Sequence, residues 1–156
     1  MSASKSLLVD SAMILALILI GVIGYKLSPL LMPKADITTN PDPGCDLHHA
    51  ACTAPLPAGG KVTFALTPRP IPVTTPLEMR VDVEGIVADK IVVDFAGVSM
   101  NMGFNRPALT AAGGGHFAGQ ATLPVCVTGR MTWQATLLIE TGRSRIAVPF
   151  RFEAGH

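Results

Sequence analysis

Charge is scarce in this chain of 156 residues, and no part of the sequence gathers basic residues. Asp, Glu, Lys and Arg together make up 15% of the chain, and the formal net charge is +1. A surface that binds a polyanion must neutralise several phosphates with clustered Lys and Arg side chains. We therefore expect no nucleic-acid partner.

Motifs for catalysis are missing as well. The sequence contains no nucleophile elbow, no metalloprotease helix, no phosphate-binding loop and no pair of carboxylates in a glycine-rich frame. Cys45 and Cys52 lack the spacing of a thioredoxin-type redox pair, and no βαβ pattern surrounds them. We therefore expect that the protein is not an enzyme.

An apolar run occupies the N-terminus. The segment Ser11–Tyr25 has no charged residue, and its extension to residues 7–31 adds only Asp10 and Lys26. A helix needs about 20 mainly apolar residues to cross the hydrocarbon of a bilayer. Residues 1–31 are therefore predicted to form one transmembrane helix.

The flanks of this run bear on processing and orientation. Lys5 precedes it, as in a signal peptide, so cleavage is the alternative. No small-x-small cleavage site follows Gly24 promptly, which favours an uncleaved anchor. Lys26 and Lys34 would oppose export, but a folded domain of about 100 residues is translocated largely regardless of flanking charge. We expect a single-pass protein of the bacterial inner membrane with its C-terminal domain in the periplasm.

Period-two hydrophobic alternation dominates the chain after residue 60. In residues 77–84 apolar and charged side chains alternate, which is typical of a half-buried strand. The same alternation recurs in 62–66, 91–95, 117–123, 133–139 and 146–152. No segment after Tyr25 sustains helical periodicity for three turns. Residues 61–156 are therefore predicted to be all-β, an immunoglobulin-like or cupredoxin-like antiparallel sandwich of about seven strands with Trp133 in its core.

Residues 32–60 are rich in proline and glycine and are predicted to tether the anchor to the sandwich. They contain the cluster Cys45, His48, His49 and Cys52. Two cysteines this close in an exported protein indicate a disulfide between Cys45 and Cys52. The alternative is a copper or zinc site in which His48 and His49 join the two thiolates.

Sulfur-bearing residues form a second candidate site, composed of Met100, Met102, Cys126 and Met131. Met100 and Met102 project to one side if the strand at 91–95 continues, and Cys126 and Met131 bracket the turn before the Trp133 strand. Thioether and thiolate ligands favour Cu(I). The alternative is that the methionines fill gaps in the core and Cys126 is a small buried apolar residue.

Three segments of the sequence carry a resemblance to known proteins: Val93–Gly103, Leu123–Cys126 and Met131–Trp133. The chain resembles a group of small, uncharacterised, membrane-anchored proteobacterial proteins over most of residues 45–153. More distantly it resembles FixH and YtkA-like periplasmic domains. Proteins of that wider kind are associated with copper delivery and cytochrome oxidase assembly. The resemblance therefore implies copper as cofactor and a respiratory oxidase, or its assembly factors, as partner, although this chain lacks a His-rich copper-chaperone pattern.

Two functions are thus compatible with the sequence. The first is a membrane-tethered periplasmic protein that binds or relays copper during respiratory-oxidase assembly. The second is a metal-free accessory or scaffold protein, whose anchor and sandwich face contact a membrane complex.

Overall fold

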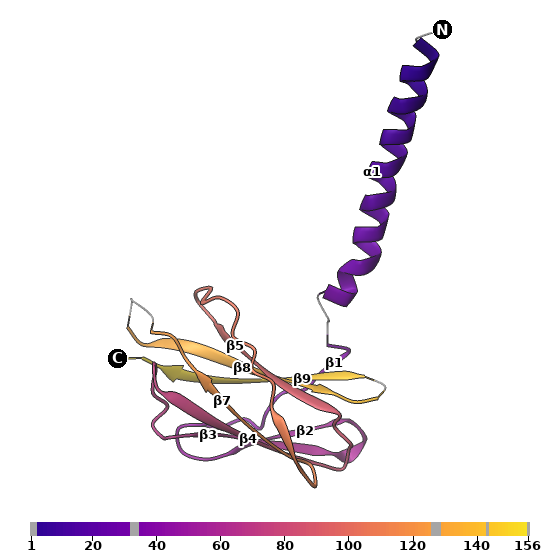
Figure 1. Ribbon diagram of the computed structural model, residues 1–156. Helices are drawn as coiled ribbons and strands as arrows, with labels where there is room; N and C mark the ends of the chain where they lie inside the picture. The colour runs from indigo at the N-terminus through magenta and orange to yellow at the C-terminus, as the bar shows by residue number, and fades with distance from the viewer. Residues whose placement is uncertain (1–2, 32–34, 126–128, 143, 156) are drawn as a thin grey trace. The chain divides into compact units, whose positions relative to one another are not determined.

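The computed structural model describes residues 3–31, 35–125, 129–142 and 144–155, and for residues 3–9 and 27–31 it describes the helical backbone only. The chain divides into two compact units, Met1–Lys34 and Ala35–His156. The first contains a single helix in its described part, α1 (Ala3–Leu31; Figure 1). Within the described residues, no helix reaches the length and apolar character needed to cross a membrane.

The second unit is a β-sandwich. Its strands in the described residues are β1 (Ile37–Thr38), β2 (Cys52–Pro55), β3 (Lys61–Thr67), β4 (Pro76–Glu84), β5 (Lys90–Gly97), β6 (Thr110–Gly113), β7 (His116–Thr122), β8 (Met131–Glu140) and β9 (Arg145–Ala154). One sheet has the order β1-β9-β8-β5 and the other the order β2-β3-β4-β7-β6. Neighbouring strands are antiparallel, apart from the parallel pair β1 and β9. The predicted β-sandwich is therefore confirmed.

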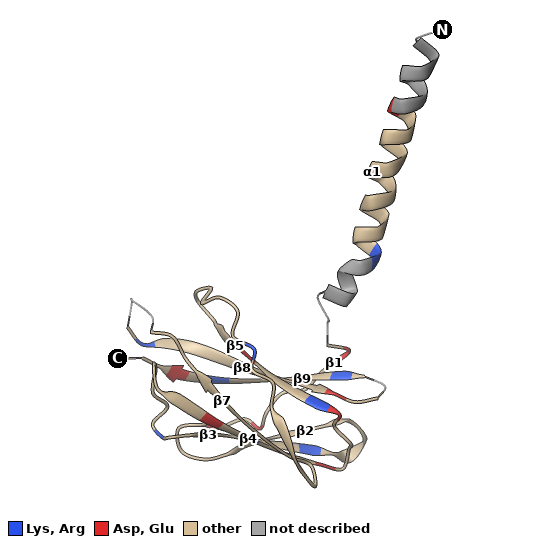
Figure 2. Cartoon of the chain, viewed as in Figure 1, with Lys and Arg blue, Asp and Glu red and all other residues tan. Residues whose placement is uncertain are grey.

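The core lies between the two sheets and is built from alternate residues of each strand. In β8 and β4 the buried positions alternate with partly or fully exposed ones, as period-two patterning requires. Trp133 is 1% exposed and belongs to this core, as predicted. No charged or polar residue among the described ones is buried. Basic and acidic positions are interspersed over both sheets (Figure 2).

A crossing segment closes one side of the sandwich. The amides of Phe95 and Val93 donate hydrogen bonds to the carbonyls of Asn105 (2.9 Å) and Pro107 (3.0 Å), so residues 105–109 cover the edge of β5. The chain then enters β6, which pairs with β7 in the opposite sheet. Because this segment is anchored to β5, the loop at 98–104 that precedes it is held close to the end of β5.

Residues 35–60 differ from the expected tether, because most of them are part of the sandwich. β1 pairs with β9, and β2 pairs with β3 over its whole length. Leu47 and Ala54 are fully buried. The burial of these apolar side chains favours packing over a solvated linker. The sandwich therefore begins near Ala35 instead of Lys61, and it has nine described strands instead of about seven.

Candidate metal centre

The candidate thioether ligands lie at one end of the sheet that contains β5 and β8. Gly97, the last residue of β5, is paired with Trp133 of β8. The Val98 amide donates a hydrogen bond of 3.0 Å to the Thr132 carbonyl, which places the start of the loop beside the start of β8. This pairing brings Met100 and Met102, which belong to the loop, near Met131.

The side chains of Met102 and Met131 converge at Gly97. A Cβ atom at this glycine would lie 2.5 Å from Met131 Cε and 3.1 Å from Met102 Cγ, and it would also press against the Met100 carbonyl oxygen. Both thioether side chains therefore reach the same point above the β5 backbone. The absence of a side chain at Gly97 makes this approach possible. We call Met100, Met102 and Met131 the methionine cluster.

The three members of the methionine cluster differ in exposure. Met131 is 7% exposed, Met102 is partly buried against the core and Met100 is 40% exposed. A surface depression of about 340 Å³, lined by residues 96–103, opens at this point. The cluster thus extends from the core to solvent. Cys126, the fourth candidate sulfur ligand, lies outside the described residues.

His48 is held by the backbone on both sides of its ring. Its Nδ1 accepts a hydrogen bond of 3.3 Å from the Ile71 amide, and its Nε2 lies 2.7 Å from the Glu153 carbonyl oxygen. Because the carbonyl can only accept, Nε2 carries the proton. Neither nitrogen is left with a lone pair free for a metal. The ring therefore joins the 44–49 turn to the 70–75 loop and to β9.

His49 has a different environment. Its Nε2 lies 3.5 Å from Asp46 Oδ2 within the same turn, and its side chain is 84% exposed. The two adjacent imidazoles thus face different partners. Among the described residues, no three His, Cys, Asp or Glu side chains come together as a set able to hold a metal ion.

Cys45 and Cys52 are joined by a disulfide, with their Cα atoms 5.4 Å apart. This separation lies within the range of about 4.4–6.8 Å typical of disulfides. Both thiols are consumed in the bond. The His48 and His49 arrangement therefore has no thiolate from these cysteines. Among the candidate soft ligands, Met100, Met102 and Met131 of the methionine cluster remain within the described residues.

Comparisons with known proteins give little further information. No protein-family model matches the chain, and no curated protein sequence matches it. Among solved structures, the chain is similar to a DUF4785 family protein from Legionella pneumophila subsp. pneumophila str. Philadelphia 1, with 11% identity and a TM-score of 0.44. This similarity covers 62% of the present chain and 29% of the other, so the chain spans less than a third of that protein. A likeness of this extent assigns no function.

Sequence reasoning missed the role of Gly97. The sequence does contain an indication of this role. Two small residues, Ala96 and Gly97, end a strand directly before a loop that contains two methionines. Small residues at this position indicate that other atoms approach the backbone closely. The identity of the approaching atoms depends on the pairing of β5 with β8, which the local sequence does not specify.

Proposed function

We propose that this protein binds or relays Cu(I) through the methionine cluster, as a periplasmic domain tethered to the inner membrane, during assembly of a respiratory oxidase. The observation that carries the proposal is the convergence of Met102 and Met131 at Gly97. Methionine thioethers are soft ligands that favour Cu(I) over harder cations. Two thioether side chains brought together, one buried and one partly buried, form the beginning of such a site.

Access to the cluster supports relay as well as binding. Met131 is held in the core while Met100 is exposed on the loop, so one end of the site is fixed and the other is open to solvent. A partner protein can then replace ligands one at a time from the exposed side. Cys126 is proposed as a thiolate ligand on the basis of its position five residues before Met131.

The proposed tether is α1. Apolar side chains with large exposed fractions occur on all sides of the helix between Met13 and Ile23. A helix that is apolar all round is typical of a membrane span. We propose that it is uncleaved and holds the sandwich on the periplasmic side. Edman sequencing of the native protein should show that the residues before Gly24 are retained, and a mature chain beginning after Gly24 in the soluble periplasmic fraction would contradict the anchor.

The connection order of the sandwich supports an immunoglobulin-like class. Strands β3, β4, β7 and β6 form one sheet and β5, β8 and β9 the other, which is the A-B-E-D and C-F-G arrangement of that fold. β1 and β2 would then be additions before strand A. In this arrangement the methionine cluster lies at the end of strand C and the beginning of strand F.

Leucine substitutions test copper binding directly. Met102→Leu and Met131→Leu remove one sulfur each but retain most of the side-chain volume, so packing changes little. The full-length protein, kept anaerobic in detergent, would be titrated with Cu(I) against a competing chelator. We expect each substitution to weaken Cu(I) binding at least tenfold. Met79→Leu is the matched control, because Met79 is buried in β4 of the other sheet and should not change the affinity.

The result also separates the two candidate functions. Equal affinities for the unmodified protein, both cluster variants and the control would contradict the copper site. The metal-free accessory or scaffold protein, contacting a membrane complex through its anchor and a sandwich face, would then be the better account.

A further inference from the structure

The central strand of the five-stranded sheet carries four charged residues on its outer face. Asp82 Oδ1 lies 2.5 Å from His116 Nδ1, and Glu84 Oε2 lies 3.1 Å from Lys61 Nζ. Glu78 and Arg80 are also exposed, but neither forms an ion pair with any other described residue. One acid and one base, two positions apart on the same face, therefore stand without partners within the described part of the chain.

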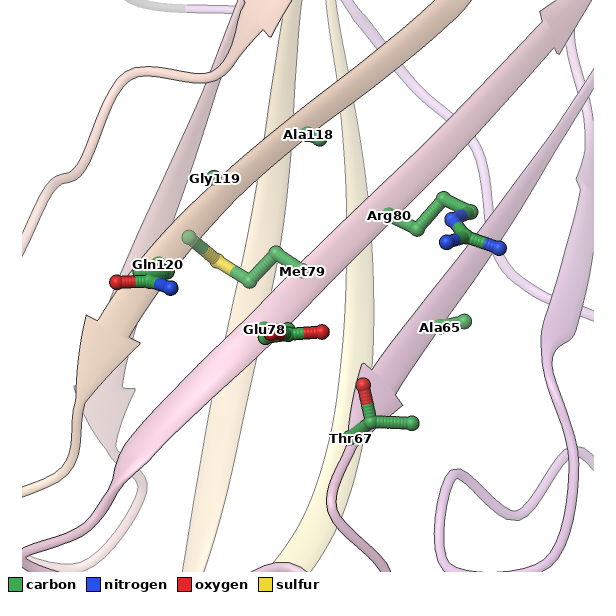
Figure 3. A pocket seen from close by; sticks show the side chains of 8 residues that line it. All are labelled: Ala65, Thr67, Glu78, Met79, Arg80, Ala118, Gly119 and Gln120. Carbon is green, nitrogen blue, oxygen red and sulfur yellow. The ribbon is translucent and has the colours of Figure 1, made fainter.

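Small side chains surround Arg80. Its cross-strand neighbours are Ala65 on β3 and Ala118 on β7, whereas Glu78 lies between Thr67 and Gln120. Together with Gly119 these residues line a hollow of about 460 Å³ on the outer face of the sheet (Figure 3). Figure 3 shows the Arg80 side chain extending over the β3 side toward Ala65. The two alanines leave space in which a long side chain from another molecule could lie.

This charge pattern is complementary to itself. A two-fold axis that lies in the interface, parallel to the sheet, perpendicular to β4 and level with Met79, brings Glu78 of each copy opposite Arg80 of the other. An interface of this kind uses the same surface patch on both subunits, which is the usual geometry of a homodimer. Carboxylate and guanidinium groups that meet directly form the strongest type of ion-pair hydrogen bond. When two sheets pack face to face, the side chains of the two facing surfaces interdigitate, so long side chains on one sheet need space between those of the other.

We propose that the outer face of the five-stranded sheet is the dimer interface of this protein. The occupant of the hollow is a second copy of the same chain, joined by two reciprocal Glu78–Arg80 pairs. The alanine-lined hollow accommodates the charged side chains that enter from the other copy. The methionine cluster belongs to the opposite sheet and remains open in this dimer.

Charge reversal tests the proposal in the full-length protein in detergent. Sedimentation equilibrium would give the dimer dissociation constant of the unmodified chain, Glu78→Arg, Arg80→Glu and the double variant. Each single reversal places like charges opposite one another and should weaken the dimer at least tenfold. The double variant restores complementarity and should return the constant to within about threefold of the unmodified value, as expected for coupled neighbours.

A matched swap on the other sheet is the control. Arg145 Nη2 and Glu140 Oε1 are 3.1 Å apart on β9 and β8, so the double reversal Glu140→Arg with Arg145→Glu should not affect the dimer. Added salt should weaken the dimer of the unmodified chain, a measurement that requires no variant. A monomeric unmodified chain, a dimer insensitive to the single reversals, or no recovery in the double variant would each overturn the proposal.

Discussion

Gly97→Ala is the most informative single substitution, because it changes the methionine cluster without removing a sulfur atom. The added Cβ would lie 2.5 Å from Met131 Cε, 3.1 Å from Met102 Cγ and in collision with the Met100 carbonyl oxygen. Side chains can move aside, but the carbonyl oxygen is part of the backbone. The loop and both thioether groups must therefore shift away from the end of β5.

The expected magnitudes follow from this collision. Adding one methyl group to a well-packed site usually costs about 1–3 kcal/mol of folding free energy, through strained rotamers and backbone shifts. The same displacement separates the two sulfur ligands. We expect Cu(I) affinity to fall at least tenfold, which corresponds to about 1.4 kcal/mol of binding free energy.

Urea denaturation and chelator-competition titration measure these two effects. Gly142→Ala is the matched control, because a Cβ there would have a single neighbour, Asp89 Oδ2, at 3.9 Å. That variant should retain the stability and the Cu(I) affinity of the unmodified protein. If Gly97→Ala is as harmless as the control in both assays, the side chains do not converge at Gly97 and the reasoning is refuted.

Three further predictions concern residues 35–60. His48→Ala should lower the free energy of unfolding by about 1–3 kcal/mol, because the Ile71 amide and the Glu153 carbonyl each lose a hydrogen bond, while His49→Ala should have little effect in the same urea titration. Replacing both Cys45 and Cys52 with Ser should cost about 2–3 kcal/mol, the entropy of closing a short loop, and an unchanged urea midpoint would contradict this. Leu47→Ala should lower the free energy of unfolding by about 2–5 kcal/mol, because Leu47 is fully buried, and thermal unfolding can measure this. A loss below about 0.5 kcal/mol would contradict the packing of this segment in the core and favour a solvated tether.

The longer strands could be predicted from the sequence because each repeats its alternation several times. Residues 77–84 fall within β4, Pro76–Glu84, and all their apolar members are buried. β1 has two residues and β6 has four exposed residues without hydrophobic alternation, so neither leaves a periodic signal. Leu47 is a single apolar residue in a polar turn, and its burial depends on contacts with distant strands.

The candidate site could be predicted only in part. Residue types indicated soft ligands at Met100, Met102 and Met131, but their proximity depends on the pairing of Gly97 with Trp133 across the sheet. The sequence offers His48 as a metal ligand only because Cys45, His49 and Cys52 are close to it in the chain. Its ring is instead bound to Glu153, 105 positions away, a contact that no local pattern contains.

Copper K-edge X-ray absorption of the Cu(I)-loaded full-length protein tests the central proposal most directly. Thioether and thiolate ligands predict a first shell dominated by sulfur, at about 2.3 Å from the metal. The sulfur count should fall by one in Met102→Leu and again when Met131→Leu is added, while Met79→Leu should leave the spectrum unchanged. A first shell of nitrogen and oxygen only, or one that is the same in all these variants, would contradict a copper site at the methionine cluster.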